Sequence, residues 1–137
     1  MTSWFNQTPA PLPASGPRKV LIADDQDSIR ELVQVTLDDP NYQILETGDG
    51  FQALELARQE QPHVALLDVM MPGLSGIEVC RTLKQDSATA GIVVILLTAK
   101  AEDADRQAGL DAGADGYVTK PFRPLHLLRL VADLLER

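Results

Sequence analysis

Several charged or hydroxyl side chains directly follow short apolar runs in this sequence. The run VLIA is followed by Asp24 and Asp25, while VALL leads into Asp68 and IVVILL into Thr98. A fifth position of this kind is Lys120, which follows GYVT. An ionised carboxylate at the end of an apolar run is costly to desolvate unless a partner compensates its charge. These residues therefore raise the question of what chemistry they do together.

The residue types indicate phosphoryl transfer assisted by a metal ion. Three carboxylates brought together would raise one another's pKa values unless a cation lay among them. The available ligands are all oxygens, which favours Mg²⁺, an ion that binds one or two carboxylates, keeps waters and accepts phosphate oxygens. Lys120 and the Thr98 hydroxyl could hold the other phosphoryl oxygens, and positioning with charge neutralisation is most of what such a reaction needs. Asp68 is the best candidate nucleophile, because it ends the strand expected between those that carry the acidic pair and Thr98.

The apolar pattern predicts the elements that position these side chains. Short continuous runs suit buried strands, and an alternating run suits an edge strand. We expect strands at 20–23, 42–46, 64–67, 92–97 and 116–119, with 42–46 at an edge. Apolar residues at helical spacing lie between the strands and after the last one. The predicted helix faces are Ile29, Leu32, Val33 and Leu37; Phe51, Leu54 and Ala57; Ile77, Cys80 and Leu83; Ala104, Ala108 and Ala112; Leu128, Val131 and Leu135.

Helix-capping residues support this division. Ser75 with Glu78 is typical of a capping box, Gly113 suits the position after a helix, and Pro124 suits a first helical turn. Strand and helix thus alternate five times, which predicts an α/β domain with three layers and a doubly wound, five-stranded parallel sheet. Ligands of such sheets bind beyond the carboxyl ends of the strands, where the polar residues are expected.

Composition limits the class of protein. The chain has 137 residues, 45% of them hydrophobic, and a net charge of −8, which suits one domain with a packed core. So acidic a chain has few cations to neutralise phosphates, and we expect no direct nucleic-acid binding. One cysteine and two distant histidines give no zinc-ligand spacing. No apolar run approaches the roughly 20 residues of a membrane span, so we expect a cytoplasmic protein without membrane attachment.

The N-terminal segment differs in composition from the rest. Residues 1–17 carry four of the nine prolines and no charged side chain. Proline at that density removes backbone donors and prevents regular structure. We expect a flexible Pro-rich arm over 1–17 and one folded domain over 18–137.

Four segments, taken in order, resemble the receiver domain of two-component response regulators, single-domain chemotaxis-type regulators included. They are VLIADDQDSIR, LLDVMMPGLSG, LLTA and GADGYVTKPF, and the resemblance extends from Lys19 to the C-terminus. It implies a flavodoxin-like fold with strand order 2-1-3-4-5. It also implies a signalling switch that is no enzyme beyond catalysing its own phosphorylation and slow dephosphorylation. A stand-alone regulator and the receiver of a longer chain would look alike at this level.

The resemblance also implies the parts of the phosphorylation site. Asp68 would be the phosphoacceptor, modified by a partner histidine kinase or histidine phosphotransfer protein. Asp25, Asp68 and the backbone carbonyl of Met70 would bind Mg²⁺ directly, and Asp24 would do so through a water. Neither His63 nor His126 follows a strand next to Asp68, so the phosphodonor is expected from another protein.

Further implied roles concern the change of state. Thr98 would be the switch hydroxyl, Lys120 the phosphate-binding lysine, and Tyr117 the aromatic that turns inward with Thr98 on activation. The bond between Lys120 and Pro121 is expected to be cis, which only X-Pro bonds adopt at low cost. Met70 and Lys100 stand where the family tunes self-dephosphorylation, and neither would orient a water, so we expect a phosphoryl group that lasts minutes rather than seconds.

The last helix indicates a surface for output. PLHLLRLVADLLER carries apolar residues over a wider arc than one sheet face needs. Neighbouring helices could cover the excess. The alternative is that the face of the fourth helix, fifth strand and fifth helix binds a downstream output protein or a second copy of the chain, under control of phosphorylation.

Three rival classes share parts of this pattern. A haloacid-dehalogenase-like phosphatase also uses an aspartate and Mg²⁺, but it needs an acid two residues after the nucleophile, where this chain has Met70. A flavin carrier on the same fold would need a phosphate-binding loop in place of DDQDS. A pseudo-receiver, which only binds proteins, usually lacks the acceptor, the acidic pair or the lysine, and all of these are present.

Overall fold

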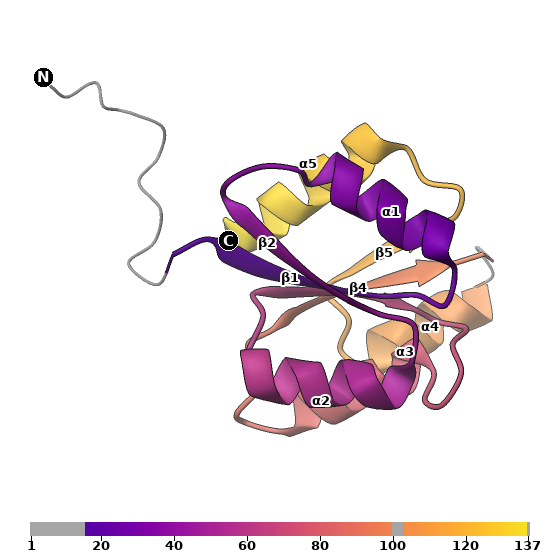
Figure 1. Cartoon of the computed structure of the whole chain (residues 1–137). Helices are drawn as coiled ribbons and strands as arrows, with labels where there is room; N and C mark the ends of the chain where they lie inside the picture. The colour runs from indigo at the N-terminus through magenta and orange to yellow at the C-terminus, as the bar shows by residue number, and fades with distance from the viewer. Residues whose placement is uncertain (1–15, 100–102, 137) are drawn as a thin grey trace, which may run out of the picture.

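The computed structural model describes residues 16–99 and 103–136. Within them, five strands alternate with five helices (Figure 1). The strands are β1 (Arg18–Ala23), β2 (Tyr42–Thr47), β3 (Val64–Asp68), β4 (Val93–Thr98) and β5 (Gly116–Thr119). The helices are α1 (Asp27–Thr36), α2 (Gly50–Glu60), α3 (Gly76–Gln85), α4 (Asp103–Asp111) and α5 (Pro124–Leu135). Every strand pair is parallel and the sheet order is β2-β1-β3-β4-β5, which confirms the predicted fold class.

Helices cover both faces of the sheet. In Figure 1, α1 and α5 lie on one side of the strands, and α2, α3 and α4 lie on the other. Successive residues of a strand point to opposite layers: Leu21 of β1 packs toward α2 and α3, whereas Val20 and Ile22 pack toward α1 and α5. All three are fully buried. Burial on both faces explains why the inner strands read as continuous apolar runs.

The edge of the sheet and the helix caps agree with the sequence. β2 lies at one edge, as predicted, and all its residues but Thr47 are half-buried or exposed. Ser75 and Glu78 form the expected capping box of α3, and Pro124 occupies the first turn of α5. Gly113 has a φ of 93°, a left-handed conformation in which a glycine after α4 avoids strain.

Two predicted helix faces differ from the observed ones. Phe51 is 61% exposed and lies beside Gly73, where an added Cβ would come within 2.8 Å of its ring. Ala57 is fully buried as predicted, and Ala53 is buried in place of Phe51, because small side chains let this helix lie close to the sheet.

In α5 the buried pair is Leu127 and Val131, while Leu128 and Leu135 are half-buried. In α4, Ala112 follows the helix and is buried, Ala108 is half-buried, and the side chain of Ala104 lies outside the described residues. Ala112 and Val131 are thus buried as predicted.

Other predictions lie at the limits of the described chain. The expected arm over 1–17 falls outside the described residues except for its last two, and it stays a prediction. Among residues 16–99 and 103–136, no helix combines the length and the apolarity that crossing a membrane requires.

Candidate functional site

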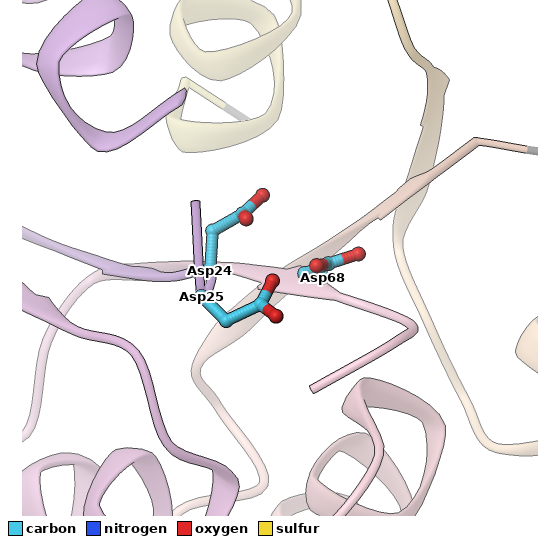
Figure 2. A group of neighbouring side chains, drawn as sticks. All are labelled: Asp24, Asp25 and Asp68. Carbon is cyan, nitrogen blue, oxygen red and sulfur yellow. The ribbon is translucent and has the colours of Figure 1, made fainter. Parts of the chain in front are cut away.

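The parallel register brings the acidic residues together at the carboxyl end of the sheet. Ala23 of β1 pairs with Leu67 of β3, so Asp24 and Asp68 are the next residues on neighbouring strands. Figure 2 shows Asp24, Asp25 and Asp68 grouped at these strand ends. One carboxylate oxygen from each lies within 4.8 Å of the other two. The three carboxylates that the sequence pointed to therefore form one cluster.

The carboxylates differ in burial and in hydrogen bonding. Asp24 is fully buried, Asp68 is 4% exposed, and Asp25 faces solvent. Oδ1 of Asp24 accepts the backbone N–H of Gln26 at 2.9 Å. Its buried Oδ2 makes an ion contact of 2.6 Å with Lys120 Nζ, but no described donor forms an aligned hydrogen bond with it. A buried carboxylate oxygen with unused lone pairs suits a hard cation, or a water that such a cation holds.

Lys120 reaches the cluster from the end of β5. Besides the contact with Asp24, its ammonium lies 3.4 Å from Oδ1 of Asp68 and donates to Oε1 of Gln26 at 3.4 Å. Its backbone N–H donates to the carbonyl of Thr98 at 2.7 Å, which continues the pairing of β4 with β5, and the bond to Pro121 is cis as expected. One cation thus lies between two of the three acids.

The surroundings of Asp68 raise its pKa to about 6. Burial is the main cause, and the negative charge of Asp24 adds to it. The backbone N–H of Met70, 3.2 Å from Oδ1, and the Lys120 ammonium act in the opposite direction. A further positive charge at this place would therefore favour the ionised form of Asp68.

The structure also places the other predicted residues. Thr98 ends β4 and is 2% exposed. It directly follows Leu97, the residue of β4 that pairs with Asp68 of β3. Tyr117 is half-buried on β5, with the guanidinium of Arg106 at 5.4 Å from its ring centre. Met70 is 75% exposed, so its side chain faces solvent beside the cluster. Lys100 lies outside the described residues.

Both histidines lie away from the acidic cluster. His63 precedes β3 at the opposite end of the sheet, and its Nδ1 accepts the backbone N–H of Lys19 at 3.0 Å. Burial lowers the pKa of His63, with the charges of Arg18 and Lys19 acting in the same direction. His126 is exposed on α5. Neither histidine therefore lies beside Asp68, as the sequence indicated, and a phosphodonor from another protein stays a prediction.

Sequence reasoning missed one cation that supports the site. Arg30 of α1 donates to the backbone carbonyl of Asp24 at 2.6 Å and pairs with Glu46 at 2.9 Å and with Asp27. A Cβ at Gly48 would lie 3.2 Å from Nη1 of Arg30, so glycine leaves room for this guanidinium. The spacing of Asp27 and Arg30 on one helix was visible in the sequence, whereas the contact with β2 depends on the sheet order.

Known proteins with similar sequences are response regulators. Residues 20–132 match the family model of the response regulator receiver domain. The DNA-binding response regulator MtrA of Mycolicibacterium smegmatis is 41% identical over 120 residues, which cover 88% of this chain and 51% of MtrA. The alkaline phosphatase synthesis transcriptional regulatory protein PhoP of Bacillus subtilis is 42% identical over the same length, covering 88% of this chain and 49% of PhoP. The chain spans about half the length of these relatives.

Solved structures of similar fold are receiver domains. The BeF3-activated receiver domain of DrrB, from Thermotoga maritima, has a TM-score of 0.80 and 38% identity over 88% of this chain and 99% of its own. Chemotaxis response regulator CheY4 of Vibrio cholerae has a TM-score of 0.80 and 33% identity, covering 86% of this chain and 98% of its own. The receiver domain of sensor histidine kinase PA1611 of Pseudomonas aeruginosa has a TM-score of 0.81 and 26% identity, covering 88% of this chain and 99% of its own. That structure has a magnesium ion coordinated in its active site cleft. Sequence and architecture together show that the chain belongs to the family of response regulator receiver domains, which are signalling switches.

Proposed function

We propose that this chain is a phosphoacceptor switch in which Asp68 receives a phosphoryl group from the phosphohistidine of a partner histidine kinase or histidine phosphotransfer protein. The observation that carries the proposal is the placement of Asp68 in a cluster of three acids, with the Lys120 ammonium between it and Asp24. This arrangement supplies a carboxylate nucleophile together with a cation that can hold phosphoryl oxygens.

Transfer would proceed by exchange of one bond at phosphorus. A carboxylate oxygen of Asp68 bonds to phosphorus while the bond from phosphorus to the donor's imidazole nitrogen breaks, and the electron pair stays on the imidazole. Asp68 must be ionised to attack, and the nearby charge of Lys120 favours that form. Lys120 and the buried Thr98 hydroxyl at the end of β4 would then bind oxygens of the phosphoryl group.

Mg²⁺ fits the donors of this cluster. The ligands are oxygens only, and Asp24 offers a buried oxygen without an aligned hydrogen bond. Asp25, Asp68 and the backbone carbonyl of Met70 would bind the ion directly, and Asp24 would bind it through a water. When bound, Mg²⁺ supplies positive charge to the acceptor carboxylate and the phosphoryl oxygens.

Output would follow from a shift between two arrangements of the α4, β5 and α5 face. Thr98 would bond to the phosphoryl group, and Tyr117 would turn inward with it. That face would then bind a downstream protein or a second copy, to an extent set by the differential stability of the two states. We place this switch in the cytoplasm, and we assign it no catalysis beyond its own phosphorylation and dephosphorylation.

A phosphatase that uses Asp68 as nucleophile has less support. Such an enzyme would need an acid to protonate the leaving group, and the corresponding position holds Met70, whose side chain points to solvent.

Intact-mass measurement after incubation with acetyl phosphate and Mg²⁺ tests the proposal. We expect one phosphate adduct on the wild type, none on Asp68→Asn, and a wild-type adduct on Asp133→Asn, a control on the exposed surface of α5. Chelation of Mg²⁺ should abolish the wild-type adduct. An adduct on Asp68→Asn, or none on the wild type, would overturn the proposal.

A further inference from the structure

The backbone carbonyl of Asp24 lies just beyond the pairing of β1 with β2. The last pair of that ladder is Ala23 with Thr47, and the Asp24 N–H still donates to the Thr47 carbonyl at 3.0 Å. The carbonyl of Asp24 accepts a side-chain donor, Nη1 of Arg30, at 2.6 Å. Arg30 thus holds the peptide group that joins Asp24 to Asp25.

The Arg30 guanidinium is itself held by two acids. Nε donates to Oε1 of Glu46 on β2 at 2.9 Å, and Nη2 pairs with Asp27 on the same helix. Glu46 also accepts the side-chain amide of Gln34 of α1. Only 17% of the arginine side chain is exposed. A planar guanidinium bonded on three sides has little freedom to move, so the Asp24 carbonyl has a fixed donor.

Gly48 leaves the room that this arrangement needs. It follows the last residue of β2, and a Cβ there would lie 3.2 Å from Nη1 of Arg30. The same Cβ would lie 3.5 Å from the carbonyl oxygen of Asp24 and from the Cα of Asp25. A side chain at position 48 would therefore crowd the guanidinium and contact the backbone of the acidic pair.

The backbone that Arg30 holds carries two acids of the cluster. Oδ1 of Asp24 accepts the Gln26 N–H at 2.9 Å, which fixes that carboxylate relative to the nearby backbone. Asp25 faces solvent, and no ion pair holds its side chain within residues 16–99 and 103–136. The direction in which the Asp25 carboxylate points therefore depends on its backbone.

We propose that Arg30 is a positioning residue of the magnesium site. By holding the Asp24 carbonyl it fixes the peptide group between Asp24 and Asp25, and with it the direction of both carboxylates. The groups that orient metal ligands commonly affect metal affinity without touching the metal. The inference rests on the proposed function in one respect, the binding of Mg²⁺ by the acidic pair.

The charge of Arg30 and its positioning role would affect Mg²⁺ binding in opposite directions. A guanidinium near the cluster repels a second cation, so a purely electrostatic role predicts tighter binding once its charge is removed. Positioning predicts weaker binding, because the acids are then less well directed. A purely structural role, in which Arg30 only ties α1 to β2, predicts lower stability and an unchanged Mg²⁺ affinity of the folded protein.

Amide NMR titration of the full chain with Mg²⁺ measures the affinity, and urea denaturation measures the stability of each variant. We expect Arg30→Gln and Arg30→Lys to weaken Mg²⁺ binding about tenfold. Lysine keeps the charge but lacks the fork of donors that reaches the Asp24 carbonyl and Glu46 together. Arg58→Gln, which removes the same charge from the exposed surface of α2, should change the affinity less than about twofold.

A second measurement needs no metal. A hydrogen bond to a carbonyl polarises its peptide group, so the carbonyl carbon of Asp24 and the amide nitrogen of Asp25 report the Arg30 contact through their chemical shifts. We expect both shifts to move upfield in Arg30→Gln and in Arg30→Lys, and to keep their wild-type values in Arg58→Gln.

Two further variants leave the charge of Arg30 in place. Gly48→Ala crowds the guanidinium and should weaken Mg²⁺ binding, though less than Arg30→Gln does. Gly91→Ala is its control, because nothing lies within 4 Å of a Cβ added there. Glu46→Ala releases the guanidinium and should weaken binding more in the wild type than in Arg30→Gln, because the two residues act through one contact.

Several results would overturn the inference. Tighter Mg²⁺ binding in Arg30→Gln would assign Arg30 a purely electrostatic role, and unchanged binding a purely structural one. Unchanged shifts at Asp24 and Asp25 would show that Arg30 does not hold their peptide group. If Arg30→Gln does not fold, Arg30→Lys and Gly48→Ala decide by the same measurements. A wild type that bound no Mg²⁺ at the acids would count against the proposed function itself.

Discussion

The Asp68 carboxylate is held between effects of opposite sign. Burial and Asp24 favour its protonated form, while Lys120 and the Met70 N–H favour the ionised form. The first pair prevails and raises the pKa to about 6. A ligand that needs the carboxylate ionised must therefore displace a proton at mildly acidic pH, which links metal binding to pH.

We predict that Mg²⁺ affinity falls as pH drops through about 6, where Asp68 takes up a proton, and not only near its ordinary value of 3.8. Calorimetric titration with Mg²⁺ between about pH 7.5 and 5 measures this, and proton release on binding should grow toward the lower pH. In Asp24→Asn the fall in Mg²⁺ affinity should shift to lower pH, because the charge of Asp24, which helps to raise the pKa of Asp68, is removed. An affinity that stayed constant down to about pH 5 would contradict the account.

A second prediction concerns the lifetime of the phosphoryl group. The Met70 side chain is exposed beside the cluster and has no polar atom to orient a water. Met70→Asn should speed loss of phosphate from Asp68 on the order of tenfold, less than the ~100-fold of a fully positioned general base. Decay of the phosphorylated protein followed by intact mass, with exposed Leu125→Asn as control, measures the rate. Equal decay in wild type and Met70→Asn would contradict this role for position 70.

Single residues also show what sequence reading can and cannot find. Asp24, Asp68 and Lys120 were predictable because each follows a recognisable strand, and parallel strands end at one edge. The contact of Arg30 with the Asp24 carbonyl was not, because a helix-surface arginine gives no sign of the backbone atom it reaches.

Among the elements, α3 begins close to the backbone of the acceptor. Gly76 begins α3, and a Cβ there would lie 2.3 Å from the backbone carbonyl oxygen of Asp68. Its N–H donates to the carbonyl of Val69 at 3.3 Å. The helix can start this close to the acceptor only because its first residue has no side chain.

We predict that Gly76→Ala lowers the free energy of unfolding by roughly 2–3 kcal/mol, since backbone atoms must shift to relieve the clash. Gly91→Ala is the matched control, because nothing lies within 4 Å of a Cβ at that position. It should change stability by less than about 0.5 kcal/mol, as surface substitutions usually do. Urea denaturation measures both, and equal effects would contradict the crowding at Gly76.

The strands and caps were predictable because local sequence determines them. Continuous apolar runs became β1, β3 and β4, and the Ser75 capping box formed as its spacing indicated. Phe51 was wrongly assigned to the core because apolar spacing does not tell how closely a helix approaches the sheet. Ala53 is buried in its place, beside Ala57, which was predicted correctly.

At the scale of the whole molecule, the ionised carboxylate of Asp68 lowers the free energy of unfolding. A group whose pKa is raised on folding stabilises the protein below its unfolded pKa, and that contribution is lost as pH rises through the folded value. For Asp68 the loss occurs between about 4 and about 6. At neutral pH without metal, the ionised acceptor is therefore a source of instability.

Asp68→Asn should accordingly raise the free energy of unfolding at pH 7.5 without Mg²⁺ by about 1–2 kcal/mol, because a neutral amide replaces a buried charge. Saturating Mg²⁺ should reduce this difference in the free energy of unfolding, because it stabilises the wild type. Urea denaturation of both proteins, with exposed Asp111→Asn as control, measures this. A variant less stable than the wild type without metal would contradict the charge balance described for the site.

A groove lined by basic side chains along α4, β5 and α5 was not apparent in the sequence. Arg106, Arg123 and Arg129 come from α4, the loop after β5, and α5, and only the fold gathers them on one face. Their spacing in an acidic chain forms no basic run. The predicted apolar surface of the last helix pointed to this region, while its charge follows from the packing.

The most direct test of the central claim is to locate the phosphoryl group. Phosphorylated protein is reduced with borohydride, which converts an aspartyl phosphate to homoserine, and the modified residue is identified by peptide sequencing in a mass spectrometer. The account predicts homoserine at position 68 only, dependent on Mg²⁺ during phosphorylation. Homoserine at another aspartate, or a phosphorylated histidine, serine or threonine with Asp68 unmodified, would contradict it.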